Sequence, residues 1–238
     1  MQIFPISDKS TQLVILTGAG ASADSGIETF RGAGGLWEGH DVMEVASPEG
    51  WEKDRELVLK FYKERHDSLH SVQPNKGHNI IAALSRDYDN FFLITQNIDD
   101  LHEKAGTCSE KLLHMHGELK KMICSEDPNH PKIKTDKHYD ITLKCRVCQG
   151  QMRPDVVWFG EIPYHMELCL NKLSSAQVFL AIGTSGLVYP AAGFSQLARG
   201  SGAYCLEINP EPTGGPFFNE VLAMTSSEGL GKLFPEYC

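Results

Sequence analysis

Residues 14–32 read VILTGAGASADSGIETFRG, a short apolar run followed directly by a glycine-rich loop. Gly18, Gly20 and Ala23 fit the spacing G-x-G-x-x-[G/A] of a dinucleotide-binding turn. The first glycine permits a tight turn, the second lets the backbone approach a pyrophosphate, and the small third residue lets helix and strand pack closely. The stretch therefore predicts a strand, a turn and a helix that together bind a dinucleotide. The acidic residue expected about 20 positions further on is not evident, which disfavours an ordinary dehydrogenase.

Four further apolar runs predict buried strands, at residues 91–97, 111–117, 177–183 and 203–209. Helix-like stretches lie before two of these runs, at residues 75–88 and 164–176. Buried strands that alternate with helices are typical of βαβ units and a parallel sheet. The sequence therefore predicts an α/β fold, with a Rossmann-type parallel sheet and helices on both faces.

Two segments depart from this alternation. Residues 118–153 are polar and contain two prolines, a group of basic residues and three cysteines, Cys124, Cys145 and Cys148. Residues 49–72 form a polar, helix-like run. We interpret the first segment as a small inserted module and expect the helical run to pack with it.

The composition is that of an ordinary globular protein of 238 residues, with 41% hydrophobic and 22% charged residues. A formal net charge of -9 gives no long-range attraction to nucleic acid or to an anionic membrane. No apolar run is long enough to span a bilayer, and residues 1–12 lack the basic and apolar regions of a signal peptide. The seven cysteines are therefore expected to be reduced thiols in a cytoplasmic protein.

A series of motifs along the chain resembles that of the sirtuins, a family of NAD-dependent protein-lysine deacylases. After the glycine loop come TQNIDDLH (95–102), HMHGEL (114–119), RPDVVWFGE (153–161), GTSGLVYPAAGF (183–194) and EINPEPT (207–213). Each motif is short, but together they follow the family's order over nearly the whole chain. The resemblance implies a large Rossmann-type domain from residues 1–31, 79–117 and 154–238. It also implies a small domain, part helical and part zinc-ribbon-like, from residues 32–78 and 118–153.

The resemblance implies a reaction that consumes NAD as co-substrate. The acyl oxygen of a modified lysine attacks the ribose carbon that bears nicotinamide, nicotinamide leaves, and the acyl group ends on ADP-ribose. His116 is the candidate base, because the unperturbed pKa of histidine lies near neutral pH. By motif position, the histidine next to Gly117 is the catalytic candidate, and His114 is expected to be structural.

The same resemblance implies a set of NAD-binding residues, two of which have a second role open to them. Asn97 and Asp99 could also cap a helix that begins just after them. The implied residues are Gly18, Ala19, Gly20, Ser22, Phe30, Arg31, Trp37, Gln96, Asn97, Ile98, Asp99, Gly183, Thr184, Ser185, Asn209 and Glu211.

Two segments are expected to bind the acyl-lysine substrate. In the family, the VVWFGE segment pairs with the substrate backbone and lines the acyl-lysine tunnel. This implies contacts from Val157, Phe159, Gly160 and Glu161. Tyr62 and Arg65 are three residues apart and share one helical face, and YKER resembles the Y-x-x-R of the desuccinylase-like branch.

The Tyr62–Arg65 pair has the chemistry to bind a carboxylate. A guanidinium stays charged and binds a carboxylate bidentately, and a phenol adds one hydrogen bond. We therefore predict a preference for succinyl, malonyl or glutaryl over acetyl groups. The alternative interpretation is a solvated helix face with a half-buried tyrosine.

The cysteines of the polar module resemble an incomplete version of the family's zinc site, which uses two C-x-x-C pairs. Cys145 and Cys148 form one pair, but only Cys124 remains of the other, with Asp127 at the place of the fourth cysteine. Asp127 or His130 could complete a tetrahedral zinc site with the three thiolates. The alternative is a module that holds together without metal.

Other functions remain open from sequence alone. On the same scaffold they are an enzyme that is mainly a deacetylase and a mono-ADP-ribosyltransferase. From other classes they are a hydride-transferring dehydrogenase and a zinc-ribbon nucleic-acid-binding module, the latter disfavoured by the acidity of the chain. The expected partners are acyl-lysine proteins, with no nucleic acid and no membrane, and the protein is expected to be a monomer.

Overall fold

In the computed structural model, residues 8–28, 36–136 and 138–238 are described. A six-stranded parallel sheet runs through the larger part of the molecule, with the order β11-β10-β9-β1-β4-β5. Its strands are β1 (Leu13–Thr17), β4 (Phe91–Thr95), β5 (Leu112–His114), β9 (Val178–Ile182), β10 (Tyr204–Ile208) and β11 (Glu220–Leu222). The prediction of an α/β fold with a Rossmann-type parallel sheet is confirmed.

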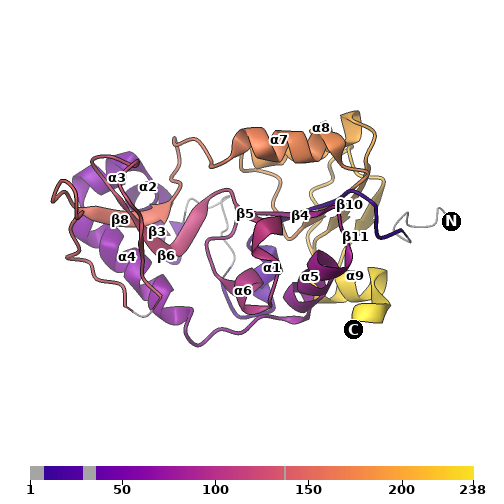
Figure 1. The fold of residues 1–238 in the computed structure, drawn as a ribbon, viewed down its shortest axis with the longest axis horizontal. Helices are drawn as coiled ribbons and strands as arrows, with labels where there is room; N and C mark the ends of the chain where they lie inside the picture. The colour runs from indigo at the N-terminus through magenta and orange to yellow at the C-terminus, as the bar shows by residue number, and fades with distance from the viewer. Residues whose placement is uncertain (1–7, 29–35, 137) are drawn as a thin grey trace.

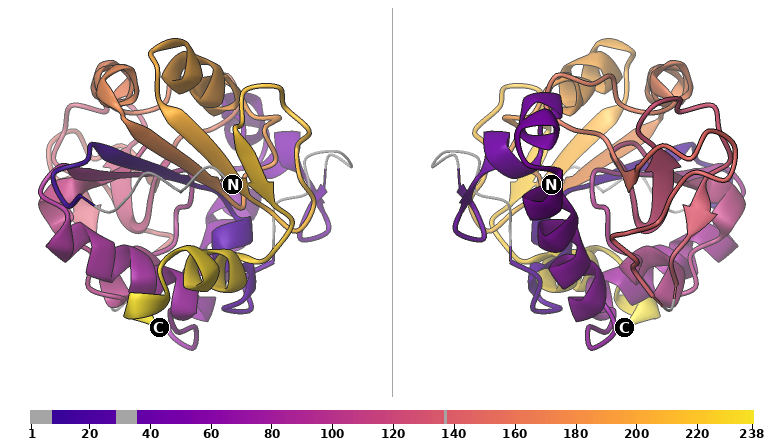
Figure 2. Two further views of the ribbon diagram at one scale, coloured as in Figure 1. Left: turned by 90° about the vertical axis from the view of Figure 1, so that its right-hand side faces the viewer. Right: turned by 90° about the vertical axis from the view of Figure 1, so that its left-hand side faces the viewer.

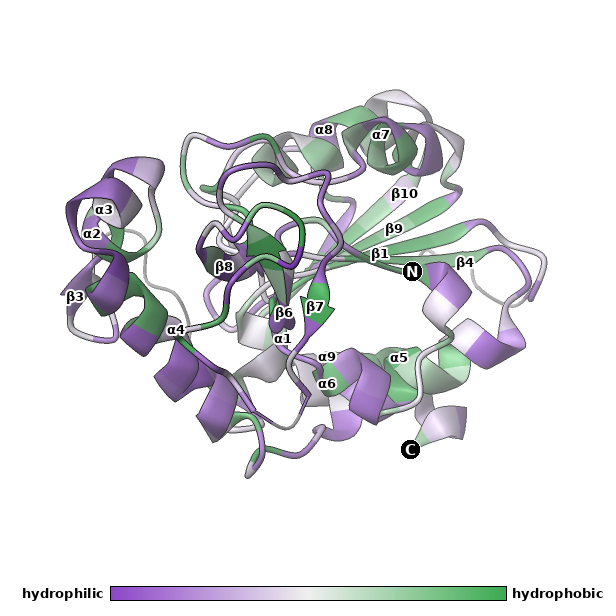
Figure 3. Ribbon diagram, turned by 60° about the vertical axis from the view of Figure 1, so that its left-hand side comes forward, coloured by the Kyte–Doolittle hydropathy of each residue, from purple (hydrophilic) through white to green (hydrophobic). Residues whose placement is uncertain are grey.

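Helices cover both faces of this sheet (Figure 1). On one face lie α7 (Met166–Ser175) and α8 (Phe194–Gly200), and on the other lie α5 (Lys76–Asp87) and α9 (Ser226–Leu233), with α1 (Gly20–Ala23) and α6 (Leu101–Lys104) beside them. Alternate residues of β1 enter separate cores, because successive side chains of a strand point to opposite faces. Leu13 and Ile15 pack towards α5 and α9, whereas Val14 and Leu16 pack towards α7 and α8. Figure 3 shows β1, β4, β9 and β10 as mainly apolar, whereas the helices carry both apolar and polar residues.

The strand order places a topological switch point beside β1. From β1 the chain adds β4 and β5 on one side, and it later returns to add β9, β10 and β11 on the other. The left view of Figure 2 shows the strands fanning out between the two helix layers. Ligands of open α/β sheets bind at the carboxyl ends of the strands next to such a point, here the ends of β1 and β9.

A second group of elements has a core of its own (Figure 1). It contains the antiparallel sheet β7-β6-β8, the hairpin β2-β3 and helices α2 to α4. The bounds are β2 (Leu36–Trp37), β3 (His40–Asp41), α2 (Val42–Val45), α3 (Pro48–Lys53), α4 (Arg55–Ser68), β6 (Gly117–Cys124), β7 (Ile133–Lys134) and β8 (Met152–Val156). Trp51, Phe61, Met122, Tyr139 and Met152 are buried together between the helices and the sheet. This separate core supports the division into two domains, which stays a proposal.

Two features differ from the pattern expected of the sequence. The helix-like run at residues 49–72 is two helices, because the backbone of Asp54 is extended and its side chain accepts a hydrogen bond from Leu57 N at 2.9 Å to begin α4. The short edge strand β11 was not predicted.

Single turns of 3-10 helix occur at Ser109–Lys111, Ala191–Gly193 and Pro235–Tyr237. Among the described residues, no helix has the length and apolarity needed to cross a membrane.

Candidate active site

The loops that follow β1 and β9 touch at the switch point. Gly18 N donates to Ile182 O at 3.0 Å, and Gly20 N donates to Gly183 O at 2.9 Å. A Cβ atom on Gly20 would lie 2.7 Å from the Cα of Gly183, closer than two carbon atoms approach. The glycine at position 20 is therefore needed for the contact between the two loops, and Ala19 between the two glycines immediately precedes α1.

A buried hydrogen-bond network lies behind the glycine loop. The Ser22 hydroxyl donates to Asp99 Oδ2 at 2.9 Å and accepts from Asn97 Nδ2 at 3.0 Å. The other oxygen of Asp99, Oδ1, accepts from Leu101 N at 3.1 Å, which satisfies the first backbone N–H of α6. Burial raises the pKa of Asp99, and the hydrogen bonds from Leu101 and Ser22 oppose this shift. The structure thus brings together three of the predicted NAD-binding residues.

His78 belongs to the same network and was missed in the sequence. Its Nδ1 accepts from Asn75 N at 3.3 Å, so the proton of the neutral ring is on Nε2, which lies 3.5 Å from the Ser22 hydroxyl oxygen. Burial lowers the pKa of His78 to about 4, so the ring is neutral at pH 7. The spacing of Asn75 and His78, three residues apart at the start of α5, was the available signal, because it is the spacing of a capping box.

Polar side chains that follow β4, β9 and β10 meet at this edge of the sheet. Gln96 Nε2, just after β4, donates to Thr184 Oγ1 at 3.0 Å. Asn209 Nδ2, just after β10, donates to Thr184 O at 2.9 Å. Exposed Glu211 follows, with its backbone N–H bonded to Asn209 Oδ1 at 3.2 Å. Ser185 is also exposed, and its hydroxyl accepts from Leu187 N at 3.3 Å.

Trp37 and Ile98, also predicted to bind NAD, lie in the second group of elements. Trp37 packs against α4, with ring centroids 5.0 Å from Phe61 and 5.9 Å from Tyr62. Half-buried Ile98 packs against the core of β6 and β8. Phe30 and Arg31 lie outside the described residues. The NAD-binding role of all the predicted residues, these four included, stays a prediction.

His116 has the hydrogen bonding of a neutral base. Its Nδ1 lies 3.1 Å from Gln96 O, and a carbonyl oxygen only accepts, so Nδ1 carries the proton and Nε2 has a free lone pair. Burial lowers the pKa of His116, against the effect of the Gln96 hydrogen bond, so the ring is neutral at pH 7. The next residue, Gly117, has φ of 82°, and a Cβ there would lie 2.0 Å from Asp155 O. His116 therefore directly precedes a tight contact between β6 and β8.

His114 is hydrogen-bonded at both ring nitrogens. Nδ1 donates to Asn97 O at 3.0 Å, and Nε2 lies 2.8 Å from Glu103 Oε1. Burial is the largest single influence and disfavours the charged ring, but the hydrogen bond and charge of Glu103, together with Glu118 and the Asn97 carbonyl, outweigh it and raise the pKa of His114. This arrangement is that of a structural histidine.

The VVWFGE segment is joined to His116 through the backbone. Val157 N donates to His116 O at 2.9 Å, and the segment turns at Gly160, with Phe159 exposed. Glu161 Oε2 accepts from Trp158 N at 2.8 Å, which closes the turn. Trp158 itself points inward, where its Nε1 donates to Tyr62 Oη at 3.1 Å. The segment thus connects the candidate base to helix α4.

Tyr62 and Arg65 lie in the interior, which contradicts the alternative of a solvated helix face. Tyr62 is 0% exposed, and burial raises its pKa. Arg65 is 8% exposed, and its Nη1 donates to Phe61 O. Arg65 Nη2 forms an ion pair with Glu38, a residue that sequence reasoning missed. Burial lowers the pKa of Arg65, and the Glu38 carboxylate opposes the shift.

Comparison with known proteins identifies the family that shares this arrangement. The model of the Sir2 family matches residues 18–190. The chain belongs to the Sir2 family. An NAD-dependent protein deacylase of Vibrio cholerae is 48% identical over 207 residues, which cover 84% of this chain and 82% of that protein. A protein of the same name from Escherichia coli K12 is 47% identical over 219 residues, which cover 89% of this chain and 76% of that protein.

A solved structure agrees with this assignment. A Sir2 homologue in complex with NAD superposes with a TM-score of 0.86 at 37% identity, over 94% of this chain and 88% of that chain. The glycine loop, the Ser22 network and His116 all lie within the part of this chain that matches the Sir2 model.

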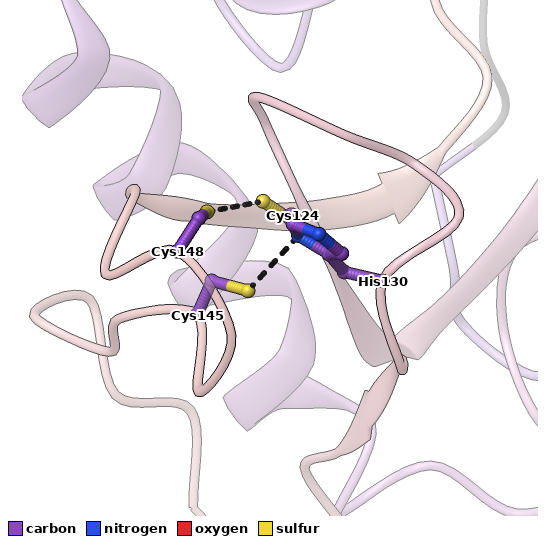
Figure 4. A group of neighbouring side chains, drawn as sticks. All are labelled: Cys124, His130, Cys145 and Cys148. Carbon is purple, nitrogen blue, oxygen red and sulfur yellow. Dashed lines mark hydrogen bonds between the residues drawn. The ribbon is translucent and has the colours of Figure 1, made fainter.

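Three cysteines and a histidine of this Sir2 chain meet at the far end of β6 (Figure 4). Cys124 Sγ lies 3.5 Å from Cys148 Sγ, and Cys145 Sγ lies 3.4 Å from His130 Nδ1, with all four ligand atoms within 4.8 Å of one another. Tetrahedral zinc with ligands at about 2.0–2.3 Å needs such atoms roughly 3.5–3.8 Å apart. The donor set and its spacing therefore fit a structural zinc ion.

Asp127, which was expected in the fourth position, supplies no ligand atom to this group. Its Oδ2 lies 3.6 Å from the outer nitrogen of His130, and its Oδ1 accepts from Asn129 N at 2.9 Å. Of the two alternatives left open by the sequence, the structure places His130 in the group, because the chain turns back at Asp127 and points the imidazole at the thiols.

Proposed function

We propose that this protein is an NAD-dependent protein-lysine deacylase that prefers acyl groups ending in a carboxylate. The observation that supports the acyl preference is the position of Arg65, which is buried on α4 beside Tyr62. Tyr62 is hydrogen-bonded to Trp158, whose neighbour Val157 bonds the backbone of His116. The names of the relatives support the reaction class.

The residues of the site have separate roles in this reaction. NAD, when bound, supplies the ribose carbon that accepts the acyl oxygen as nicotinamide leaves. Nε2 of His116 takes a proton from a ribose hydroxyl, because its lone pair is free while Gln96 holds Nδ1. Ser22, Asn97 and Asp99 position the ribose and the nicotinamide amide through their hydrogen bonds. The VVWFGE segment, exposed at Phe159, pairs with the substrate backbone.

The acyl preference follows from the cost of burying charge. A carboxylate in an apolar tunnel is unstable unless it is paired and hydrogen-bonded. Arg65 supplies a fixed positive charge, and Tyr62 has a hydroxyl hydrogen with no acceptor among the described residues, since its oxygen accepts from Trp158. Both groups therefore suit a succinyl, malonyl or glutaryl terminus, and neither is needed by acetyl.

The test is nicotinamide release from NAD with succinyl- and acetyl-lysine forms of one peptide. Loss of a charged hydrogen bond of this kind costs about 2–5 kcal/mol, so Arg65→Met should lower kcat/KM for the succinyl peptide by roughly 30-fold or more. Acetyl turnover should change much less. The matched control is Lys63→Met, which removes a cation from α4 that pairs with Asp67 on the surface. It should leave both rates unchanged.

A second variant separates the chemistry from the acyl preference. His116→Ala should abolish release with both peptides while the melting temperature stays near that of the wild type. Turnover that survives in His116→Ala would contradict the role of the base. Equal losses on both peptides in Arg65→Met, or a wild-type preference for acetyl, would instead indicate an enzyme that is mainly a deacetylase.

The proposal also covers the metal ion, the cellular compartment, the oligomeric state and the protein partners. One zinc ion per chain is held by Cys124, His130, Cys145 and Cys148 and stabilises the fold without entering the reaction. The substrates are acyl-lysine proteins met in the cytoplasm by a monomeric enzyme. The net charge of -9 supports protein partners over nucleic acid.

A further inference from the structure

The guanidinium of Arg65 is only partly satisfied by its neighbours. Nη1 donates to Phe61 O, Nη2 is paired with Glu38, and Nε is buried with no partner in the part of the chain that the structure describes. The guanidinium carbon lies 3.2 Å from the centroid of the Phe61 ring and 5.7 Å from that of Trp37. Within the described residues, the strongest anionic partner of this buried cation is therefore the Glu38 carboxylate.

Glu38 lies in the tight turn of the β2-β3 hairpin, and from there its side chain contacts Arg65. Glu38 and Gly39 join β2 to β3 with φ of 46° and 83°, and two successive positive φ values are typical of a type I′ hairpin turn. The hairpin is anchored on α4 by Trp37, described above, and by His40, whose ring centroid lies 5.3 Å from that of Phe61. A glutamate in this backbone region costs about 1–2 kcal/mol, so the packing of the hairpin holds it there.

We propose that Glu38 is an internal counter-ion of Arg65 that an acidic acyl group displaces, and that it thereby sets the ratio of succinyl to acetyl turnover. The inference rests on the acyl preference proposed above. With a neutral acyl group, the Glu38 carboxylate keeps the buried guanidinium paired, which avoids the penalty of an isolated buried charge. With a succinyl group, a second carboxylate arrives at the same cation and repels Glu38.

Glu38 is free to leave when that happens. Its side chain is 35% exposed, whereas that of Arg65 is 9% exposed, so the glutamate can turn into water while the arginine cannot. The need to displace Glu38 still lowers the apparent affinity for the succinyl peptide. Only those enzyme molecules in which Glu38 has left Arg65 can bind the acyl carboxylate. Glu38 therefore favours acetyl and disfavours succinyl, although it contacts neither when they react.

The experiment compares Glu38→Gln with wild type on succinyl- and acetyl-lysine forms of one peptide at saturating NAD. We expect KM for the succinyl peptide to fall by about tenfold, because Arg65 no longer has a competing anion. We expect kcat/KM for the acetyl peptide to fall several-fold. In Glu38→Gln the Arg65 guanidinium has no carboxylate partner while it is buried beside the neutral acetyl group. The two substrates should move in opposite directions.

Glu64→Gln is the matched control. Glu64 also lies near Arg65, at 3.9 Å from Nη1, but its side chain is 76% exposed. Exposed ion pairs contribute little, so removing this charge should leave the ratio unchanged. A shift in Glu64→Gln as large as in Glu38→Gln would mean that the general loss of negative charge is the cause, and would overturn the proposal.

Further outcomes separate this inference from the proposed acyl preference. A succinyl KM that stays constant or rises in Glu38→Gln would mean that Glu38 orients Arg65 or has no role, and would overturn the displacement model. In an Arg65→Met background, Glu38→Gln should have no effect on either substrate. If Arg65→Met alone lowers succinyl turnover selectively while Glu38→Gln leaves the ratio unchanged, this inference fails and the proposed acyl preference stands. If Arg65→Met lowers both rates equally, the acyl preference itself fails.

Discussion

Replacing Tyr62 with phenylalanine removes one oxygen atom from the interior and tests the link between α4 and the substrate segment. The side chain is 0% exposed, and its oxygen accepts the indole N–H of Trp158 at 3.1 Å. In Tyr62→Phe the ring still fills its space, but the buried Trp158 N–H loses its acceptor. A buried donor left unsatisfied costs about 1–3 kcal/mol. At about 2–4 °C per kcal/mol for a protein of this size, the melting temperature should fall by about 2–12 °C.

Tyr139→Phe is the matched control, because Tyr139 is equally buried in the same core. Its hydroxyl has no hydrogen-bond partner among the described residues, so its removal leaves nothing unsatisfied. Tyr139→Phe should be neutral or slightly stabilising. The two variants differ only in whether the lost oxygen had a partner, which makes the difference in melting temperature the informative quantity.

Kinetics on the same variants separate stability from recognition. If the Tyr62 hydroxyl donates to an acyl carboxylate, Tyr62→Phe should lower kcat/KM for a succinyl-lysine peptide by about 10- to 150-fold, the equivalent of a charged hydrogen bond of about 1.5–3 kcal/mol. The acetyl-lysine peptide should react at close to the wild-type rate below the melting temperature. Equal melting temperatures for Tyr62→Phe and Tyr139→Phe would refute the role of the Trp158 hydrogen bond. Equal losses on both peptides would refute the role in acyl recognition.

Three further predictions follow from the site. Burial lowers the pKa of His116 below 6.5, so kcat/KM should be at its maximum above that lowered pKa and should be lost as the pH falls through it. A fall in kcat/KM that begins at or above pH 6.5 would contradict this. His130→Ala should weaken zinc retention against a chelator by at least about tenfold, with a smaller effect in Asp127→Ala, and wild-type zinc content in His130→Ala would count against the assignment. Gly117→Ala places a methyl group 2.0 Å from Asp155 O at φ of 82°, so urea denaturation should show a loss of about 3 kcal/mol or more, and an unchanged midpoint would exclude this steric explanation.

The sequence allowed the large sheet to be predicted because its strands are continuous apolar runs. Five of its strands lie where runs such as residues 91–97 and 177–183 indicated. The sixth, Glu220–Leu222, could not be found this way, because a three-residue edge strand with one polar residue has no periodicity to detect. The break at Asp54 was also missed, since one capping residue decides it and the flanking residues favour helix on both sides.

Side-chain pairing was predictable only where a motif fixes the neighbours. Ser22, Asn97 and Asp99 are brought together by the ends of β1 and β4, which the strand order specifies. The Glu38–Arg65 pair joins residues 27 apart through a hairpin whose packing depends on tertiary contacts, and no spacing rule indicates it. His130 likewise enters the thiol group through the course of a loop, which sequence spacing left undecided between it and Asp127.

The separate core around α4 bears on how such an enzyme can change over evolutionary time. Tyr62 packs with the elements of the small sheet, whereas the strands that present the glycine loop pack in two other cores. Energetic effects at sites that share no contacts add nearly independently. Substitutions on α4 can therefore accumulate and change which acyl group is removed. The dinucleotide-binding loop and the stability of the cores behind it are not affected by such substitutions.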